Sequence, residues 1–208
     1  MNKRKYSLGE EIFNSTSHGV GIILSLVALI LMIVFSSSVI ELTSSIIFGS
    51  TLILLYTSST LYHAITNEKA KRVFQILDHC TIYLLIAGSY TPYALLTIGG
   101  NKGWIIFAII WASAIFGILL NAINLSKFRL LSIALYVAMG WAIAFFLPQL
   151  LAGLELGGLI LLIAGGLAYT LGLVFYIIKK IKYFHSVWHL FVLGASICHI
   201  LSVIIYVL

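Results

Sequence analysis

Residues 157–178 read GGLILLIAGGLAYTLGLVFYII, a run of 22 residues without a charged side chain. A helix needs about 20 consecutive apolar residues to cross the hydrocarbon core of a bilayer. The run is apolar throughout and does not alternate between apolar and polar residues, as a strand of a membrane barrel would. Because a helix satisfies its backbone hydrogen bonds internally, we expect these residues to form a membrane-spanning helix.

Six further apolar runs of similar length divide the rest of the chain. Hydrophobic residues make up 62% of the 208 positions and charged residues 9%, against roughly 25% charged residues in ordinary globular proteins. We therefore predict an all-α, polytopic membrane protein in which residues 1–208 form one seven-transmembrane-helix bundle. The first run is too long for the apolar core of a cleaved signal peptide, and further spans follow it. The predicted spans are residues 18–40, 45–63, 74–98, 104–124, 130–148, 157–178 and 185–208.

The basic residues indicate how the chain is oriented. Eleven of the twelve lysines and arginines lie before the first span or in alternate loops after it, and only Lys102 lies in a loop on the other side. Positively charged segments stay in the cytoplasm during insertion, so we expect the N-terminus inside and the C-terminus outside, in a cell membrane. The net charge of +6 then reflects this topology and gives the protein some affinity for anionic lipid head groups. It does not indicate nucleic-acid binding.

Histidines gather at the predicted cytoplasmic ends of two spans. His63 ends the second span, and His185 and His189 begin the seventh. The last two are four residues apart, so they project from one face of a helix and can reach one metal ion. Three protein ligands with an open position for water are typical of catalytic zinc, which neutral imidazole binds well. The pattern therefore indicates a zinc site formed by His63, His185 and His189.

Two other polar side chains lie at a similar depth. Asp78 is the only acidic residue inside a predicted span, and an ionisable group there is costly unless it has a functional partner or cavity. Beside a metal it would orient a water molecule and accept its proton. Ser59 lies four residues before His63 on the same helix face, where it can bind a water, a substrate oxygen or a ligand imidazole. We name Asp78 and Ser59 as candidate catalytic residues.

Simpler interpretations remain open from the residues alone. A His-x-x-x-His pair is weak evidence for a metal, histidines near helix ends also serve as interfacial anchors, and Ser59 also suits helix packing. A haem bound by two histidines would leave the third histidine and Asp78 unexplained. A retinal photoreceptor would require a lysine in the seventh span, which has none. His18, His79 and His199 are weaker ligand candidates, and for His199 we favour packing or an interhelical hydrogen bond.

Several short motifs occur along the chain in a particular order and spacing: Glu11–Asn14, Thr16–Gly19, Ser59–His63, Leu77–His79, Gly88–Pro92 and His185–His189. Together they resemble the hemolysin III branch of the progestin and adipoQ receptor family. The resemblance implies seven helices, an N-terminus inside and a buried zinc near the cytoplasmic face. It also implies that the three histidines bind the metal directly and that Asp78 reaches it through water. Ser59 is similar to a serine of the wider superfamily, which includes alkaline ceramidases.

Two functional hypotheses follow. In the first, the protein is a zinc-dependent hydrolase that cleaves an amide or ester bond of a lipid, which enters laterally from the bilayer. In the second, zinc joins the second, third and seventh helices, and the protein is a non-enzymatic sensor, receptor or membrane-permeabilising protein. A structural zinc usually has four protein ligands, whereas a catalytic zinc keeps an open position. The sequence leaves the substrate lipid, the trigger and the oligomeric state open.

Overall fold

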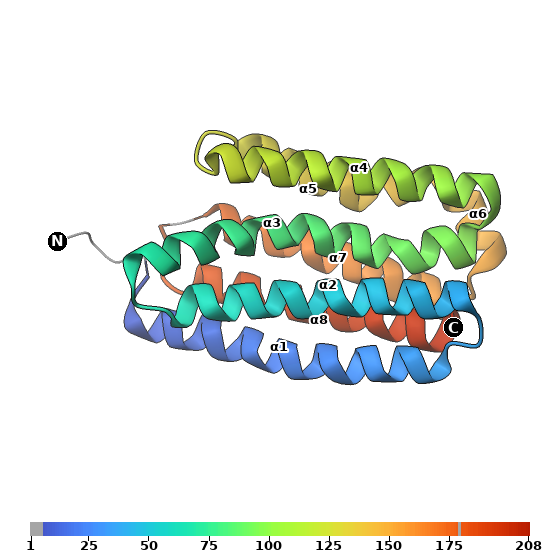
Figure 1. Ribbon diagram of the computed structural model, residues 1–208, viewed down its shortest axis with the longest axis horizontal. Helices are drawn as coiled ribbons and strands as arrows, with labels where there is room; N and C mark the ends of the chain where they lie inside the picture. Colours follow the sequence, from blue (N-terminus) through green and yellow to red (C-terminus); the bar gives the residue numbers. More distant parts are fainter. Residues whose placement is uncertain (1–5, 179) are drawn as a thin grey trace.

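The computed structural model describes residues 6–178 and 180–208, which form an all-helical bundle (Figure 1). Seven helical segments in this part of the chain are long and apolar enough to cross a membrane, so the predicted fold class is confirmed. The helices are α1 (Leu8–Phe35), α2 (Val39–Ala64), α3 (Glu68–Pro92), α4 (Gly100–Asn124), α5 (Arg129–Trp141), α6 (Leu147–Gly153), α7 (Leu156–Ile177) and α8 (Phe184–Tyr206).

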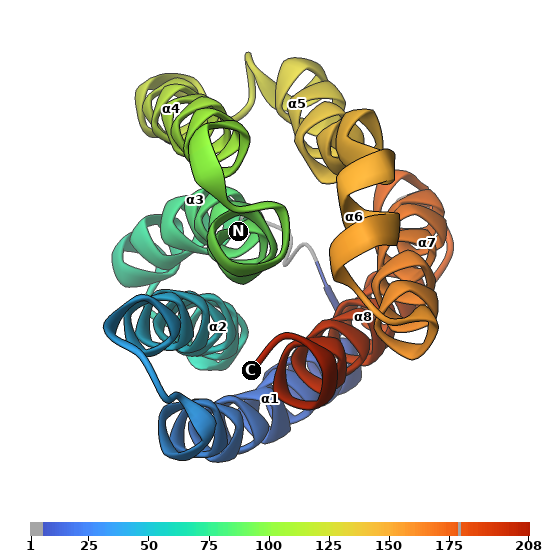
Figure 2. The same cartoon turned by 90° about the vertical axis from the view of Figure 1, so that its right-hand side faces the viewer.

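The helices follow one another around the bundle, and α8 packs against α1 to complete it (Figure 2). The span that begins with α3 is the most buried of the seven: 61% of its most apolar 18-residue window is buried inside the protein. In the span formed by α5 and α6, 11% of the corresponding window is buried. The outer surface is apolar, as expected for a surface that faces lipid tails. Buried polar side chains therefore lie on the inner faces of the helices, among them α1, α2, α3 and α8.

Helix α1 begins at Leu8, well before the predicted start of the first span at His18. Ser7 caps the helix in a reciprocal capping box with Glu10: the Ser7 hydroxyl accepts from the Glu10 backbone, and the Glu10 carboxylate accepts from the Ser7 backbone. At 1.5 Å per residue, the 28 residues of α1 extend about 42 Å, more than the roughly 30 Å of hydrocarbon. Its first turns therefore carry Glu10 and Glu11 within the helix, and Asp78 is not the only acidic residue in a spanning helix.

Two spans are interrupted by irregular turns at their ends away from the histidines. Pro92 ends the α-helical part of α3, and residues Tyr93–Ile98 continue it as a π-helical turn in which the Gly99 amide donates to the Ala94 carbonyl. In the fifth span, a 3-10 segment at Ala142–Phe146 connects α5 to α6, which has Pro148 in its first turn. A proline at this position loses no helical hydrogen bond, so it fits the start of a new helical segment.

The connections between α2 and α3, α4 and α5, and α7 and α8 all lie at the end of the bundle where α1 begins (Figure 1). Every candidate residue of the metal site lies on a helix near this end. His63 is in the last turn of α2, His185 and His189 are in the first two turns of α8, and Asp78 is in the N-terminal half of α3. The up-and-down course of the chain is what brings these residues to a common depth.

Candidate metal centre and cavity

Three histidines from two helices converge inside the bundle. One ring nitrogen from each of His63, His185 and His189 lies within 4.8 Å of the other two. His63 and His189 are buried, and His185 is half-buried. The rings also contact one another, with 4.9 Å between the centroids of His63 and His189 and 4.8 Å between those of His185 and His189. These three residues could hold one metal ion.

His63 is held in place by two side chains of α1. Its Nδ1 lies 2.6 Å from a carboxylate oxygen of Glu11 and 3.5 Å from the amide nitrogen of Asn14. A carboxylate only accepts hydrogen bonds, so the Glu11 contact places a proton on Nδ1 of the imidazole. The other nitrogen, Nε2, is buried without a hydrogen-bond partner. A neutral His63 therefore has a lone pair on Nε2 that is free to bind a metal ion.

The paired histidines of α8 face each other. The two Nε2 atoms of His185 and His189 are 3.2 Å apart, a distance at which two neutral rings share at most one proton. Tyr6 stacks on the outer side of His185, with 4.8 Å between ring centroids and 16° between planes. Burial raises the pKa of the Tyr6 hydroxyl above its ordinary value, so this ring is a neutral cover for the cluster.

The donor set fits a zinc ion. Neutral imidazole nitrogen is a preferred zinc ligand, and three such ligands leave one position of a tetrahedron open. The unpartnered Nε2 of His63 is the clearest observation, because a buried nitrogen without a partner costs free energy that a metal ion would recover. Zinc-binding histidines commonly donate their other ring N–H to a carboxylate, which is the contact that His63 makes with Glu11.

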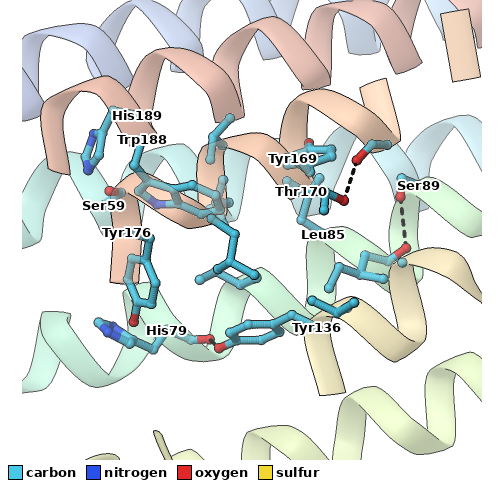
Figure 3. Close-up of a pocket in the computed structure, with 18 of the residues that line it drawn as sticks. Ser59, His79, Leu85, Ser89, Tyr136, Tyr169, Thr170, Tyr176, Trp188 and His189 are labelled. Atoms are coloured by element: carbon cyan, nitrogen blue, oxygen red, sulfur yellow. Dashed lines mark hydrogen bonds between the residues drawn. The ribbon is translucent and has the colours of Figure 1, made fainter. Parts of the chain in front are cut away.

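A cavity of about 120 Å³ extends from the histidines into the bundle (Figure 3). His185, His189, Ser59 and Asp78 all line it. The hydroxyl oxygen of Ser59 is buried without a hydrogen-bond partner. Most of the remaining wall is apolar and includes Leu55, Ile82, Leu85, Ile86, Val137, Leu173, Trp188 and Val192. The structure thus places both candidate catalytic residues on the wall of the cavity that begins at the histidines, and their roles stay predictions.

The three other histidines have distinct surroundings. His18 is 3% exposed, and its ring stacks on His189 with 3.8 Å between centroids; neither of its nitrogens has a hydrogen-bond partner. His79 lies on the cavity wall, 3.5 Å from the carboxylate of Asp78. In α8, Nε2 of His199 donates to the Leu162 carbonyl of α7 over 3.2 Å, which confirms the predicted interhelical hydrogen bond.

Sequence reasoning missed the contribution of α1 to the site. Glu11 pairs with His63 and also with Lys71, whose Nζ is 2.8 Å from the second carboxylate oxygen. Asn14 contacts His63 and accepts a 2.6 Å hydrogen bond from the Ser186 hydroxyl of α8, so it connects α1 to the helix of the other two histidines. The capping pattern Ser7-x-x-Glu10 would have extended the helix to include these residues.

One side of the cavity lies between α5 and α7. Gly140 and Trp141 of α5 face Gly166 and Thr170 of α7 on this side of the cavity. The Trp141 indole donates a 3.0 Å hydrogen bond to the Thr170 hydroxyl at the exposed surface. This bond closes the seam between two helices that otherwise make few contacts with each other.

Comparisons with known proteins identify relatives that cover nearly the whole chain. A model of the family described as "Haemolysin-III related" matches residues 6–200. The "Hemolysin-3 homolog" of Bacillus subtilis (strain 168) is 41% identical over 204 residues, which cover 97% of this chain and 96% of that protein. "Hemolysin-3" of Bacillus cereus is 41% identical over 211 residues, 100% of this chain and 96% of that one. The human "Monocyte to macrophage differentiation factor" is 29% identical over 196 residues, 91% of this chain and 81% of its own. The protein therefore belongs to the haemolysin-III related family of multi-pass membrane proteins.

Proposed function

We propose that this protein is a zinc-dependent hydrolase that cleaves an amide or ester bond of a membrane lipid. The observation that carries the proposal is the convergence of three imidazoles, two of which, those of His185 and His189, line an apolar cavity with the unpartnered hydroxyl of Ser59 on its wall. An apolar cavity with a few convergent polar groups is the usual form of a small-molecule site. A lipid meets both requirements, because it has an apolar chain and a polar linkage.

The chain's own residues have separable tasks in this reaction. His63, His185 and His189 would hold zinc, which when bound supplies Lewis-acid polarisation of a carbonyl group and a lowered pKa of water. The Asp78 carboxylate accepts a proton from the attacking water and returns it to the leaving nitrogen or oxygen. The Ser59 hydroxyl donates a hydrogen bond to the carbonyl oxygen as negative charge develops there. Apolar side chains around the cavity bind the acyl chain and exclude bulk water.

The substrate enters from the bilayer, through the seam between α5 and α7. The seam has small residues on both sides, Gly140 and Gly166, and one hydrogen bond across it, between Trp141 and Thr170. Breaking this bond exposes the cavity to lipid tails and not to water. Bacterial relatives and the distribution of basic residues support a location in a bacterial cell membrane, with the histidines near the cytoplasmic face.

A non-enzymatic function is the second candidate. Two of the relatives bear the name hemolysin, and a third is named as a differentiation factor. In this account, zinc joins α2 to α8 and the protein permeabilises membranes or senses their state. The carboxylate of Asp78 would then complete the coordination shell, and the metal would have no open position.

Metal content and hydrolysis measured on the same preparations distinguish the two functions. We expect about one zinc per chain by plasma mass spectrometry of the detergent-purified protein, lost in His63→Ala and His189→Ala and largely retained in Asp78→Ala. The zinc-loaded protein should release fatty acid from a ceramide or from an ester lipid in neutral vesicles. Bound zinc without hydrolysis of either class, together with zinc-dependent release of haemoglobin from erythrocytes, would favour the second candidate. A zinc content that is the same in the wild type and in both histidine variants would exclude the metal site.

A further inference from the structure

A second, smaller pocket of about 70 Å³ lies beside the main cavity, at the histidine end of the bundle. It is formed where the start of α5 meets α3 and α7. Gln75, Ser126, Arg129 and Ser132 line it, together with three residues that it shares with the main cavity. Among the described residues that line this pocket, none is a carboxylate.

Arg129 is the charged group of the pocket, and its surroundings leave it incompletely satisfied. Its Nε is buried without a hydrogen-bond partner, and no acidic side chain within the described ranges forms an ion pair with it. The guanidinium lies over the ring of Tyr176, 5.8 Å from the centroid, and also forms a hydrogen bond with the Tyr176 side chain, so Tyr176 holds the group in place while Nε remains for a ligand. Leaving a buried donor of a charged group unpaired is costly, and the guanidinium fork matches an oxyanion.

The floor of the pocket is fixed by hydrogen bonds between three helices. The Tyr136 hydroxyl donates to the backbone carbonyl of His79 over 2.8 Å, and the Asn121 amide donates to the same hydroxyl over 3.2 Å. The Ser132 hydroxyl donates to the Asn121 amide oxygen over 2.7 Å. Helix α5 starts at Arg129, which lines the pocket, and no side chain caps its first turn. The hydroxyl hydrogens of Tyr136 and Ser132 are used within this network, so the donors left for a ligand are those of Arg129, Ser126 and the first turn of α5.

The small pocket borders the main cavity. His79, Tyr136 and Tyr176 line both, and they lie along one edge of the cavity in Figure 3. A ligand that occupied both pockets would place an anionic group against Arg129 and an apolar chain in the cavity. The polar linkage between the two would then lie near Ser59 and the histidines.

We propose that Arg129 and the polar wall around it form a binding site for a phosphate-type anion, which is supplied by the head group of a membrane lipid or by free phosphate. The guanidinium fork, the Ser126 hydroxyl and the amides of the first turn of α5 offer several donors to several oxygens, which suits a phosphate group. The site does not depend on a metal or on hydrolysis, so it goes beyond the proposed function. If that function also holds, the site selects anionic lipids as substrates.

Thermal unfolding in a neutral detergent tests the site with three probes: inorganic phosphate, dihexanoyl phosphatidic acid and uncharged dihexanoyl glycerol. We expect phosphatidic acid to raise the unfolding midpoint of the wild type and the glycerol lipid to have a much smaller effect. In Arg129→Gln, the dissociation constant for phosphatidic acid should increase at least tenfold. The matched control is Lys127→Gln, which removes the same charge from an exposed side chain two residues away and should bind like the wild type.

The outcomes separate the two sources and can overturn the proposal. Stabilisation by phosphatidic acid alone identifies a lipid head group, and equal stabilisation by inorganic phosphate identifies a free anion. The site would be rejected if Lys127→Gln and Arg129→Gln lost the same amount of affinity for phosphatidic acid, or if Arg129→Gln bound it like the wild type. Either result would mean that the anion binds through general surface charge. If Arg129→Gln does not fold, Arg129→Lys keeps the charge but loses the fork, and it should bind at least threefold more weakly.

Discussion

A carboxylate oxygen of Glu11, in the first turn of α1, lies 2.6 Å from Nδ1 of His63, in the last turn of α2. The contact determines which nitrogen of His63 carries the proton and so leaves Nε2, which is buried without a hydrogen-bond partner, as the nitrogen free to bind a metal. The Lys71 ammonium binds the other oxygen and holds the Glu11 carboxylate in position. Glu11 is therefore a positioning residue for the candidate metal centre.

Replacing Glu11 by glutamine should weaken metal binding without abolishing it. Gln keeps the size of the side chain but lacks the negative charge that stabilises the Nδ1 proton and makes Nε2 a stronger ligand. We expect zinc affinity to fall roughly 10- to 100-fold, measured by competition with a chelator of known affinity.

Glu10→Gln is the control for this substitution. Glu10 binds Ser7 and the backbone amide of Tyr183, and it has no contact with His63 in these interactions. The zinc affinity of the Glu10→Gln variant should stay within about twofold of that of the wild type. Equal zinc affinities in Glu11→Gln and the wild type would show that His63 needs no carboxylate to bind the metal.

Substitutions of Ser59 and Asp78 should reduce hydrolysis without removing the metal. Because neither belongs to the three-histidine group, Ser59→Ala and Asp78→Asn should retain most of the zinc. Lipid hydrolysis should nevertheless fall by about a hundredfold or more in each, since each removes a group that acts on the reacting atoms. Zinc content and the initial rate of fatty acid release, measured on the same sample, provide the test.

Ser58→Ala is the matched control for Ser59→Ala. The Ser58 hydroxyl is also buried, but it bonds the Leu55 carbonyl and Thr81 and so connects α2 to α3. Its loss should reduce stability by about 1 kcal/mol and leave the rate of the folded, zinc-loaded protein nearly unchanged. Rates that fall equally in both serine variants would indicate that Ser59 acts through packing.

Gly165 should not tolerate a side chain, whereas its neighbour Gly166 should. A Cβ atom added to Gly165 would collide with the imidazole of His199, and one added to Gly166 would meet nothing within 4 Å. The His199 ring cannot move freely, because its Nε2 is bonded to the Leu162 carbonyl. We expect Gly165→Ala to lose about 1–3 kcal/mol of stability, and Gly166→Ala to lose none. Unfolding in a denaturing detergent measures both stabilities. Similar stabilities would mean that α7 and α8 can separate at little cost.

The seven spans could be predicted because each depends on local composition alone. A run such as residues 157–178 has no stable alternative in a bilayer to a helix, whatever surrounds it. The grouping of His63 with His185 and His189 also followed from the sequence, since alternate loops bring alternate helix ends to the same side. What could not be predicted was which side chains meet within that layer, because rotation of each helix about its axis is fixed by packing.

The contribution of α1 was missed for a physical reason. A search for apolar runs excludes polar turns, so Glu11 and Asn14 fell outside the predicted span although they lie on the inner face of its helix. The 3-10 segment Ala142–Phe146 and the π-helical turn Tyr93–Ile98 were also beyond prediction. Both are departures from regular helix in apolar sequence that has no glycine or proline within it to mark them.

The orientation of the bundle should place the metal centre near the cytoplasm. Lys102, in the first turn of α4, lies at the end of the bundle opposite the histidines, and the other seven basic residues of the described ranges lie at the histidine end. Because positively charged segments resist translocation, alkaline phosphatase fused after Leu208 should be exported and active. Green fluorescent protein at the same position should stay dark, and the same protein fused after Lys127 should fluoresce. Bright fluorescence of the fusion after Leu208 would show that the bundle has the opposite orientation. The histidines would then take their metal from outside the cell.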